Sequence, residues 1–144
     1  MAEPQSFKNH AKFVPLFHGF AFPIAAINFF WAAYRAYTRP SWDTAIAALL
    51  GAALIAVFFF ARIFALAVQD RVIRLEERLR MREQLPADLV ARIPEFTTSQ
   101  LIALRFASDA ELPALARKVL DERLTERKVI KQMIKDWKAD HQRV

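Results

Sequence analysis

The chain has 144 residues, a formal net charge of +6 and no cysteine, which excludes disulfide frameworks and thiolate metal sites. With three histidines in the chain, a structural zinc site is not expected. Residues 69–144 hold 16 of the 21 lysines and arginines and 13 of the 15 acidic residues, whereas hydrophobic residues, 55% of the whole, concentrate before them. A hydrophobic half joined to a charged half is typical of a membrane protein with a cytosolic part.

Two apolar runs predict an all-α fold built on a transmembrane helical hairpin. They cover residues 13–34 and 44–68, and a membrane-spanning helix needs about 20 residues. A cleaved signal peptide is the alternative for the first run, but that run is too long and too aromatic, so a retained span is expected. The predicted organisation is an N-terminal cytoplasmic or interfacial segment, the hairpin and a cytoplasmic helical domain, over residues 1–12, 13–68 and 69–144.

Aromatic and basic residues indicate the orientation of the hairpin. Trp31, Tyr34 and Trp42 surround the predicted loop, as in the aromatic belt of a membrane interface. Seven lysines and arginines flank the outer ends of the two runs and two lie in the loop, so the positive-inside rule places both termini in the cytoplasm. Arg62 is expected at the cytoplasmic interface with its stem along the membrane; the alternative is an intramembrane charge on an ion pathway.

Small and polar side chains share one face of each span. On the first helix these are His18, Ala21, Ala25, Asn28, Ala32 and Arg35; on the second they are Ala45, Ala48, Ala52 and Ala56, with Gly51 beside them. Small residues at helical spacing let backbones approach closely, and asparagine can hydrogen-bond across the contact. The pattern predicts helix packing, within the hairpin or between protomers; a polar ligand site is the alternative.

Histidines near the membrane raise the question of a cofactor. His10 and His18 are eight residues apart on one segment, so they cannot flank one haem within a protomer, and only a haem shared across an oligomer remains open. No bound cofactor is predicted. Pro23 removes an amide hydrogen inside the first span and predicts a kink near Gly19.

The N-terminal string from Gln5 to His18, with its Lys-Asn-His sequence, is followed by Pro23 and Asn28. It resembles the start of an uncharacterised bacterial family of small membrane proteins with two apolar helices and a helical tail. The resemblance extends along most of the chain and implies a protein of the bacterial inner membrane. It implies no activity and no catalytic positions.

The second apolar helix is expected to continue past the membrane. Val72, Leu75 and Leu79 recur at spacings of three and four, after Ala65 and Val68, as in the seam of a coiled coil. The alternative is that this stripe packs on the protein's own C-terminal helices. An ion pair between Glu76 and Arg80, one turn apart, is also expected.

The C-terminal part is predicted to contain a short helix between Pro86 and Pro94, a helix over 98–106 and a helical pattern from Leu112 to Lys138. The apolar patch at residues 112–120 is expected to fold back on 89–106, leaving the patch at 130–137 for a partner or the membrane surface. Trp137 among lysines is typical of an amphipathic basic helix that binds anionic headgroups; ordinary core packing is the alternative.

The leading functional hypothesis is a non-enzymatic structural or interaction protein, either self-associating or an accessory subunit of a membrane complex. The two glycines both lie in the apolar runs, so a glycine-rich phosphate loop is excluded. Mixed charge in the C-terminal half disfavours nucleic-acid binding. The alternative is a redox or transport accessory subunit that uses His10, His18 and Asn28. The expected partners are the lipid bilayer and other copies or a larger membrane complex.

Overall fold

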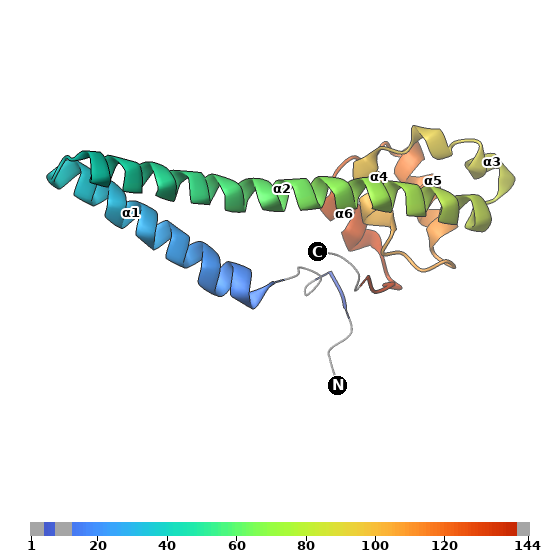
Figure 1. Ribbon diagram of the computed structural model, residues 1–144. Coiled ribbons are helices and arrows are strands. Elements are labelled where there is room, and N and C mark those ends of the chain that lie inside the picture. Colours follow the sequence, from blue (N-terminus) through green and yellow to red (C-terminus); the bar gives the residue numbers. More distant parts are fainter. Residues whose placement is uncertain (1–4, 8–12, 141–144) are drawn as a thin grey trace. The chain divides into compact units, whose positions relative to one another are not determined.

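The computed structural model describes residues 5–7 and 13–140, and within them every regular element is a helix. The predicted all-helical fold is confirmed. Figure 1 shows the elements in chain order, whose bounds are η1 Pro15–Ala21, α1 Phe22–Thr38, α2 Trp42–Gln84, α3 Ala87–Val90, η2 Ile93–Glu95, α4 Thr98–Leu104, α5 Leu112–Asp121 and α6 Arg127–Met133. The chain forms two compact units, which we describe separately: a hairpin unit before position 67, and a helical unit that joins the residues after position 66 to residues 5–7.

The hairpin unit consists of η1, α1 and the first part of α2. The residues before Pro23 form a π-helical segment, η1, in which the Phe22 N–H bonds to the Phe17 carbonyl, and the kink expected near Gly19 stays a prediction. A proline has no amide hydrogen for the carbonyl four residues earlier, and a wider π turn is one way to absorb this defect.

The turn between α1 and α2 is fixed by reciprocal capping. The Thr44 N–H donates to the Ser41 hydroxyl at 3.2 Å, and the Ser41 N–H donates to the Thr44 hydroxyl at 3.0 Å. This exchange satisfies two amides at the start of α2. The Thr44 hydroxyl also contacts the Arg39 carbonyl at 3.1 Å. A connection this short makes the two helices antiparallel neighbours, as Figure 1 shows.

Both helical runs are long and apolar enough to cross a membrane. Pro15–Thr38 has 24 residues and Trp42–Gln84 has 43, and their most apolar 18-residue windows are only 6% and 11% buried. The core helix of a soluble protein would be mostly buried. The outward side chains of these helices are left uncovered by the described chain.

The helical unit has a closed core. As predicted, α2 continues well past Val68; Met81 in its last turn and Leu85 just after its end contribute to this core. Helices α4, α5 and α6 close around them, and Ile130 of α6 has no exposed surface. Met133 and Ile134 pack against this core and Trp137 stacks on Phe106, so the expectation that the patch at 130–137 is left for a partner or the membrane surface is wrong. The fully buried side chains include Leu89, Leu101, Leu104, Phe106, Leu112 and Val119.

The helical pattern expected from Leu112 to Lys138 is interrupted. Helix α5 ends in a Schellman motif, in which the Leu124 N–H bonds to the Val119 carbonyl and the Arg123 N–H to the Leu120 carbonyl. Arg123 adopts φ 52°, the left-handed conformation of the position that glycine usually occupies. Polar residues at 121–123 and 125–128 interrupt the apolar stripe here, so the chain turns and brings α6 back onto α4.

Candidate functional site

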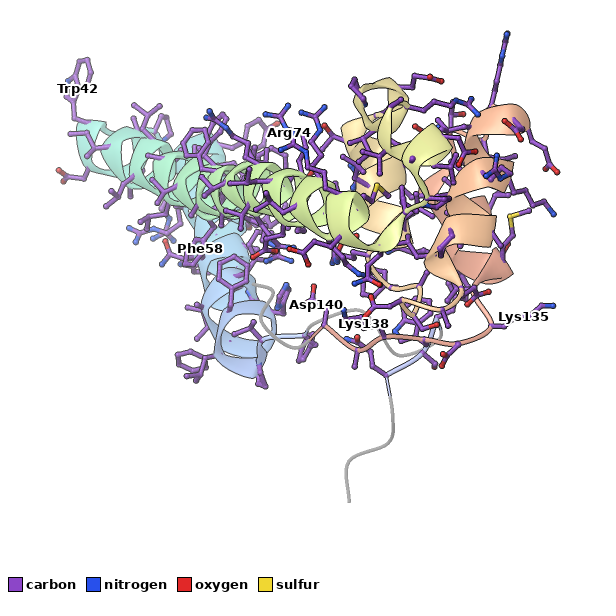
Figure 2. The ribbon with its side chains drawn as sticks, turned by 90° about the vertical axis from the view of Figure 1, so that its right-hand side faces the viewer. Trp42, Phe58, Arg74, Lys135, Lys138 and Asp140 are labelled. Atoms are coloured by element: carbon purple, nitrogen blue, oxygen red, sulfur yellow. The ribbon has the colours of Figure 1, made fainter. Side chains whose placement is uncertain are left out.

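Close packing of α1 on α2 is centred on Gly51. A Cβ atom added to Gly51 would lie 3.0 Å from the Phe29 Cα atom, tighter than most real Cβ contacts, so a side chain here would push the two helices apart by a few tenths of an ångström. Further along, the Phe58 ring meets the Phe17 ring edge-on at a centroid distance of 5.5 Å. Figure 2 shows Phe58 directed from α2 towards the π-helical segment.

The predicted small-residue faces are only partly inside this contact. On α1, Ala25 and Ala32 are buried, and Ala21, the last residue of η1, is half-buried; on α2, Gly51 is buried and Ala48 half-buried. Ala52 and Ala56 are exposed, as is Ala45. The α2 face that meets α1 instead follows a seven-residue repeat, with Thr44, Gly51 and Phe58 on it. Packing of Ala52 and Ala56 between protomers stays a prediction.

Asn28 lines a groove near the turn of the hairpin. The groove encloses about 340 Å³, and its walls include the exposed polar side chains of Arg35 and Asp43 besides the buried Thr44. Trp31 also lines it. A guanidinium, a carboxylate and an amide around one groove can bind a zwitterionic or polar group by charge and hydrogen bonding.

His18 is held by its own segment. Its Nδ1 atom lies 3.1 Å from both the backbone N and the carbonyl O of Val14, and its ring stacks on Phe13 at 5.1 Å. Asn28 follows about three helical turns later, so His18 and Asn28 do not share one site. His10 lies outside the described residues. Among the residues that the structure describes, no three metal-ligating side chains cluster.

The aromatic residues around the hairpin turn are exposed. Trp31, Tyr34 and Trp42 have 61%, 59% and 86% of their surface accessible. Figure 2 shows Trp42 projecting from the end of α2. Arg62 is half-buried, about five turns along the same helix. The aromatic side chains at the turn, and Arg62 towards the other end of the hairpin, are therefore accessible to a membrane interface.

Beyond the apolar run, α2 has two different faces. Ile73, Met81 and Leu85 are buried against the helical unit. On the other side, Val72, Leu75 and Leu79 are 48%, 62% and 50% exposed. The stripe predicted as a coiled-coil seam is therefore not covered by the C-terminal helices. The buried face of α2 has a four-residue spacing that the sequence already contains. The charged Glu77 interrupts this apolar spacing, so the face was not recognised from the sequence.

Three arginines border this exposed stripe. Arg71, Arg74 and Arg78 line a groove of about 360 Å³ together with Val72 and Leu75. Figure 2 shows Arg74 extending from α2.

The ion pair expected between Glu76 and Arg80 is not formed, because Arg80 is engaged elsewhere. Its guanidinium pairs with Glu77 at 3.2 Å and with Asp109 at 2.6 Å, and it donates to the Arg105 and Ala107 carbonyls at 3.3 and 2.6 Å. Only 13% of the Arg80 side chain is exposed. Sequence reasoning missed this role, because all the partners except Glu77 lie 25 or more residues away.

The two carboxyl groups beside Arg80 respond differently to their surroundings. Burial raises the pKa of Glu77, although the Arg80 charge opposes this shift. The hydrogen bond from Arg80 holds the pKa of the more exposed Asp109 below its usual range. Arg80 thus connects α2 to the segment between α4 and α5. Of its two carboxylate partners, Glu77 is the one whose charged form is destabilised by burial.

Trp137 packs on the helical unit. Its ring stacks on Phe106 with centroids 4.6 Å apart, and the Lys131 ammonium lies 4.8 Å from the Phe106 centroid. Because α6 ends at Met133 and Trp137 forms an isolated bridge with Ala107, Trp137 is not on a helix. The expected amphipathic basic helix at this position is wrong.

These features define an all-helical chain in which two helices that can cross a membrane are joined to a separate, closed helical unit. The chain belongs to a family of unknown function (DUF6526), whose model matches residues 1–144. Comparisons with curated proteins and with solved structures found no match.

Proposed function

We propose that this chain is a non-enzymatic, membrane-anchored interaction module. Its hairpin crosses the bacterial inner membrane twice, both termini lie in the cytoplasm, and the helical unit is presented at the cytoplasmic surface. There the protein self-associates or joins a larger membrane complex. The observation that carries this proposal is the contrast between a hairpin whose apolar side chains face outward and a helical unit whose apolar side chains are enclosed.

The energetics support membrane insertion. Exposed apolar surface costs about 25 cal/mol per Å² in water, and the outward side chains include Phe20, Ile27, Phe30, Leu49, Leu50, Phe59 and Phe64, each at least 60% exposed. A bilayer removes this cost and tolerates helices, because their backbone hydrogen bonds are satisfied within the helix.

Contacts inside the helical unit support a structural role. Its charged side chains join helices to one another: Arg92 to Asp121 at 2.9 Å, and Arg117 to Asp88 at 2.7 Å. Hydrogen bonds between Gln5 and Asp140 link the two described ends of the chain, which agrees with an even number of membrane crossings.

Cysteine labelling can test the proposed sidedness, because the chain has no cysteine of its own. We expect Ala139→Cys to react with a membrane-impermeant maleimide only after cells are permeabilised, and Arg39→Cys to react in intact spheroplasts. The opposite pattern would reverse the orientation, and recovery of the protein in the soluble fraction of lysed cells would exclude membrane insertion.

Self-association can be tested by counting labelled copies in lipid nanodiscs or vesicles over a wide range of protein-to-lipid ratios. We expect more than one copy per assembly at ratios where random co-occupancy is negligible. A strictly monomeric protein, with no partner in complexes extracted gently from native membrane, would contradict the proposal.

A further inference from the structure

The surface of α2 just beyond the apolar run is organised in parallel stripes. At about 100° per residue, Val72, Leu75 and Leu79 fall within an arc of about 60°. By the same geometry, the arginines Arg71 and Arg78 border one side of this apolar stripe, and the acidic Glu76 and Glu83 border the other.

The stripes lie away from the protein's own core. Ile73, Glu77 and Met81, which pack against the helical unit, are on the opposite side of α2 and are at most 7% exposed. The apolar stripe remains about half exposed. A second helix can therefore approach it without displacing the helical unit from α2.

The charges that flank the stripe have no partners within the described chain. Elsewhere in the helical unit Arg80, Arg92, Arg117 and Arg127 each form an ion pair. Among residues 5–7 and 13–140, no ion pair involves the flanking charges Arg71, Arg78, Glu76 and Glu83.

We propose, resting on the membrane-anchored module described above, that this surface binds the same surface of a second copy as a parallel, in-register, two-stranded coiled coil. Val72 and Leu79 occupy a positions and Leu75 the d position between them. Arg71 and Arg78 are then at g, and Glu76 and Glu83 at e. Each g arginine lies opposite the e glutamate five residues later in the other copy: Arg71 faces Glu76, and Arg78 faces Glu83.

The charge arrangement selects the parallel orientation. In a parallel pair the basic flank of one helix meets the acidic flank of the other, whereas an antiparallel pair brings g next to g and e next to e, which juxtaposes like charges. Two copies inserted in one membrane with the same orientation are already parallel. Val72 at a with Leu75 at d is the β-branched and leucine combination that favours two strands.

The seam is short, and membrane attachment compensates for this. About two heptads fit before Pro86, and Arg82 takes the next d position, so the isolated segment would not dimerise stably. Confinement of both copies to one bilayer raises their effective concentration and makes a weak contact sufficient.

Charge exchange on the full-length protein in vesicles tests the pairing. One variant carries Arg71→Glu and Arg78→Glu, and the other carries Glu76→Arg and Glu83→Arg. We expect each alone to lose at least tenfold in self-association, measured by energy transfer between labelled copies, because like charges then face each other. Mixing the two variants is expected to restore association. The control, Arg123→Glu with Lys128→Glu, removes the same charge from exposed positions elsewhere and is expected to behave like the wild type.

Register is tested by single cysteines. Leu75→Cys is expected to form an intermolecular disulfide under mild oxidation, because d positions face each other, whereas Arg74→Cys at a c position is not. If the wild type associates but charge reversal has no effect and Leu75→Cys does not cross-link, the coiled coil is refuted and the interaction module stands. If the wild type does not associate at all, the self-associating function fails first.

Discussion

Gln5 and Asp140, 135 residues apart, exchange two hydrogen bonds. The Gln5 Nε2 atom donates to the Asp140 carbonyl at 3.2 Å, and the Asp140 N–H donates to the Gln5 Oε1 atom at 2.8 Å. The Asp140 carboxylate in turn pairs with Arg105 at 3.0 Å. A single amide side chain thus joins the segment before the hairpin to the last described segment of the helical unit, next to the Arg105–Phe106 backbone.

Replacing Gln5 should loosen the C-terminal segment. We expect Gln5→Ala to cost about 1 kcal/mol of local stability, the usual net value for lost hydrogen bonds of this kind. Amide hydrogen exchange of the full chain in detergent micelles should show faster exchange at Asp140. Gln5→Glu keeps one acceptor and loses the donor, so an intermediate effect is expected; unchanged exchange in both variants would show that the contact is energetically neutral.

Arg80 should be among the most sensitive positions of the helical unit. Arg80→Gln leaves Glu77 buried without its ion-pair partner, and we expect a loss of about 3 kcal/mol in unfolding free energy. Arg80→Lys retains the charge but loses the planar guanidinium, which contacts two carboxylates and two carbonyls. This variant should therefore recover only part of the unfolding free energy lost in Arg80→Gln. Thermal unfolding followed by Trp137 fluorescence measures both. Arg82→Gln, at an exposed position two residues later, is the control, and an equal loss there would contradict a specific role.

The stability of the helical unit should depend on pH through Glu77. Because burial raises its pKa above the usual 4.5, the folded state holds this proton more tightly than the unfolded state. The contribution of Glu77 to the unfolding free energy is fully present below pH 4.5. It declines as the pH rises through the raised pKa. Asp109 has the opposite sign: its lowered pKa stabilises the fold above its usual 3.8, and this is lost in acid.

Glu77→Gln isolates the first of these effects. The variant should lack the decline above pH 4.5 and should unfold a few degrees higher than the wild type at pH 7, by circular dichroism melting. Glu76→Gln, an exposed neighbour, should follow the wild-type profile. A lower melting temperature for Glu77→Gln at pH 7 would mean that the ion pair with Arg80 outweighs the burial of the carboxylate.

Gly51 should be intolerant of side chains. Gly51→Leu forces a side chain against the Phe29 backbone, and overpacking of this kind costs about 1–3 kcal/mol. Steric trapping of the hairpin in bicelles would measure the weakened association of α1 with α2. Ala52→Leu adds a similar side chain at the exposed neighbouring position, and a comparable loss there would indicate that residue 52 is also in a packed interface.

Arg123 offers a stabilising substitution. Its left-handed backbone costs a non-glycine residue about 1–2 kcal/mol. The greater freedom of glycine in the unfolded chain offsets part of this gain. Arg123→Gly should therefore raise the unfolding free energy by a net amount of about 1 kcal/mol. Lys128→Gly, inside α6, should lower it by about 1 kcal/mol. Chemical denaturation of both variants provides the comparison, and destabilisation by Arg123→Gly would show that the arginine side chain has a role of its own.

The sequence by itself determined the features that depend on local periodicity. Length and hydropathy predicted two helices able to cross a membrane, and the spacing of Val72, Leu75 and Leu79 identified a stripe on a helix that continues past the apolar run. These properties follow from one turn of helix and the next, so neighbouring residues are enough to reveal them.

The tertiary structure decided which face of each helix is covered. Arg80 could be paired with Glu76 from spacing alone, but it binds Glu77 and the distant Asp109. The patch around Ile130 looked available until the turn at Arg123 returned α6 to the core. Contacts between residues far apart in the chain depend on where turns direct the helices, and small differences in capping and backbone conformation, invisible to hydrophobic periodicity, set those directions.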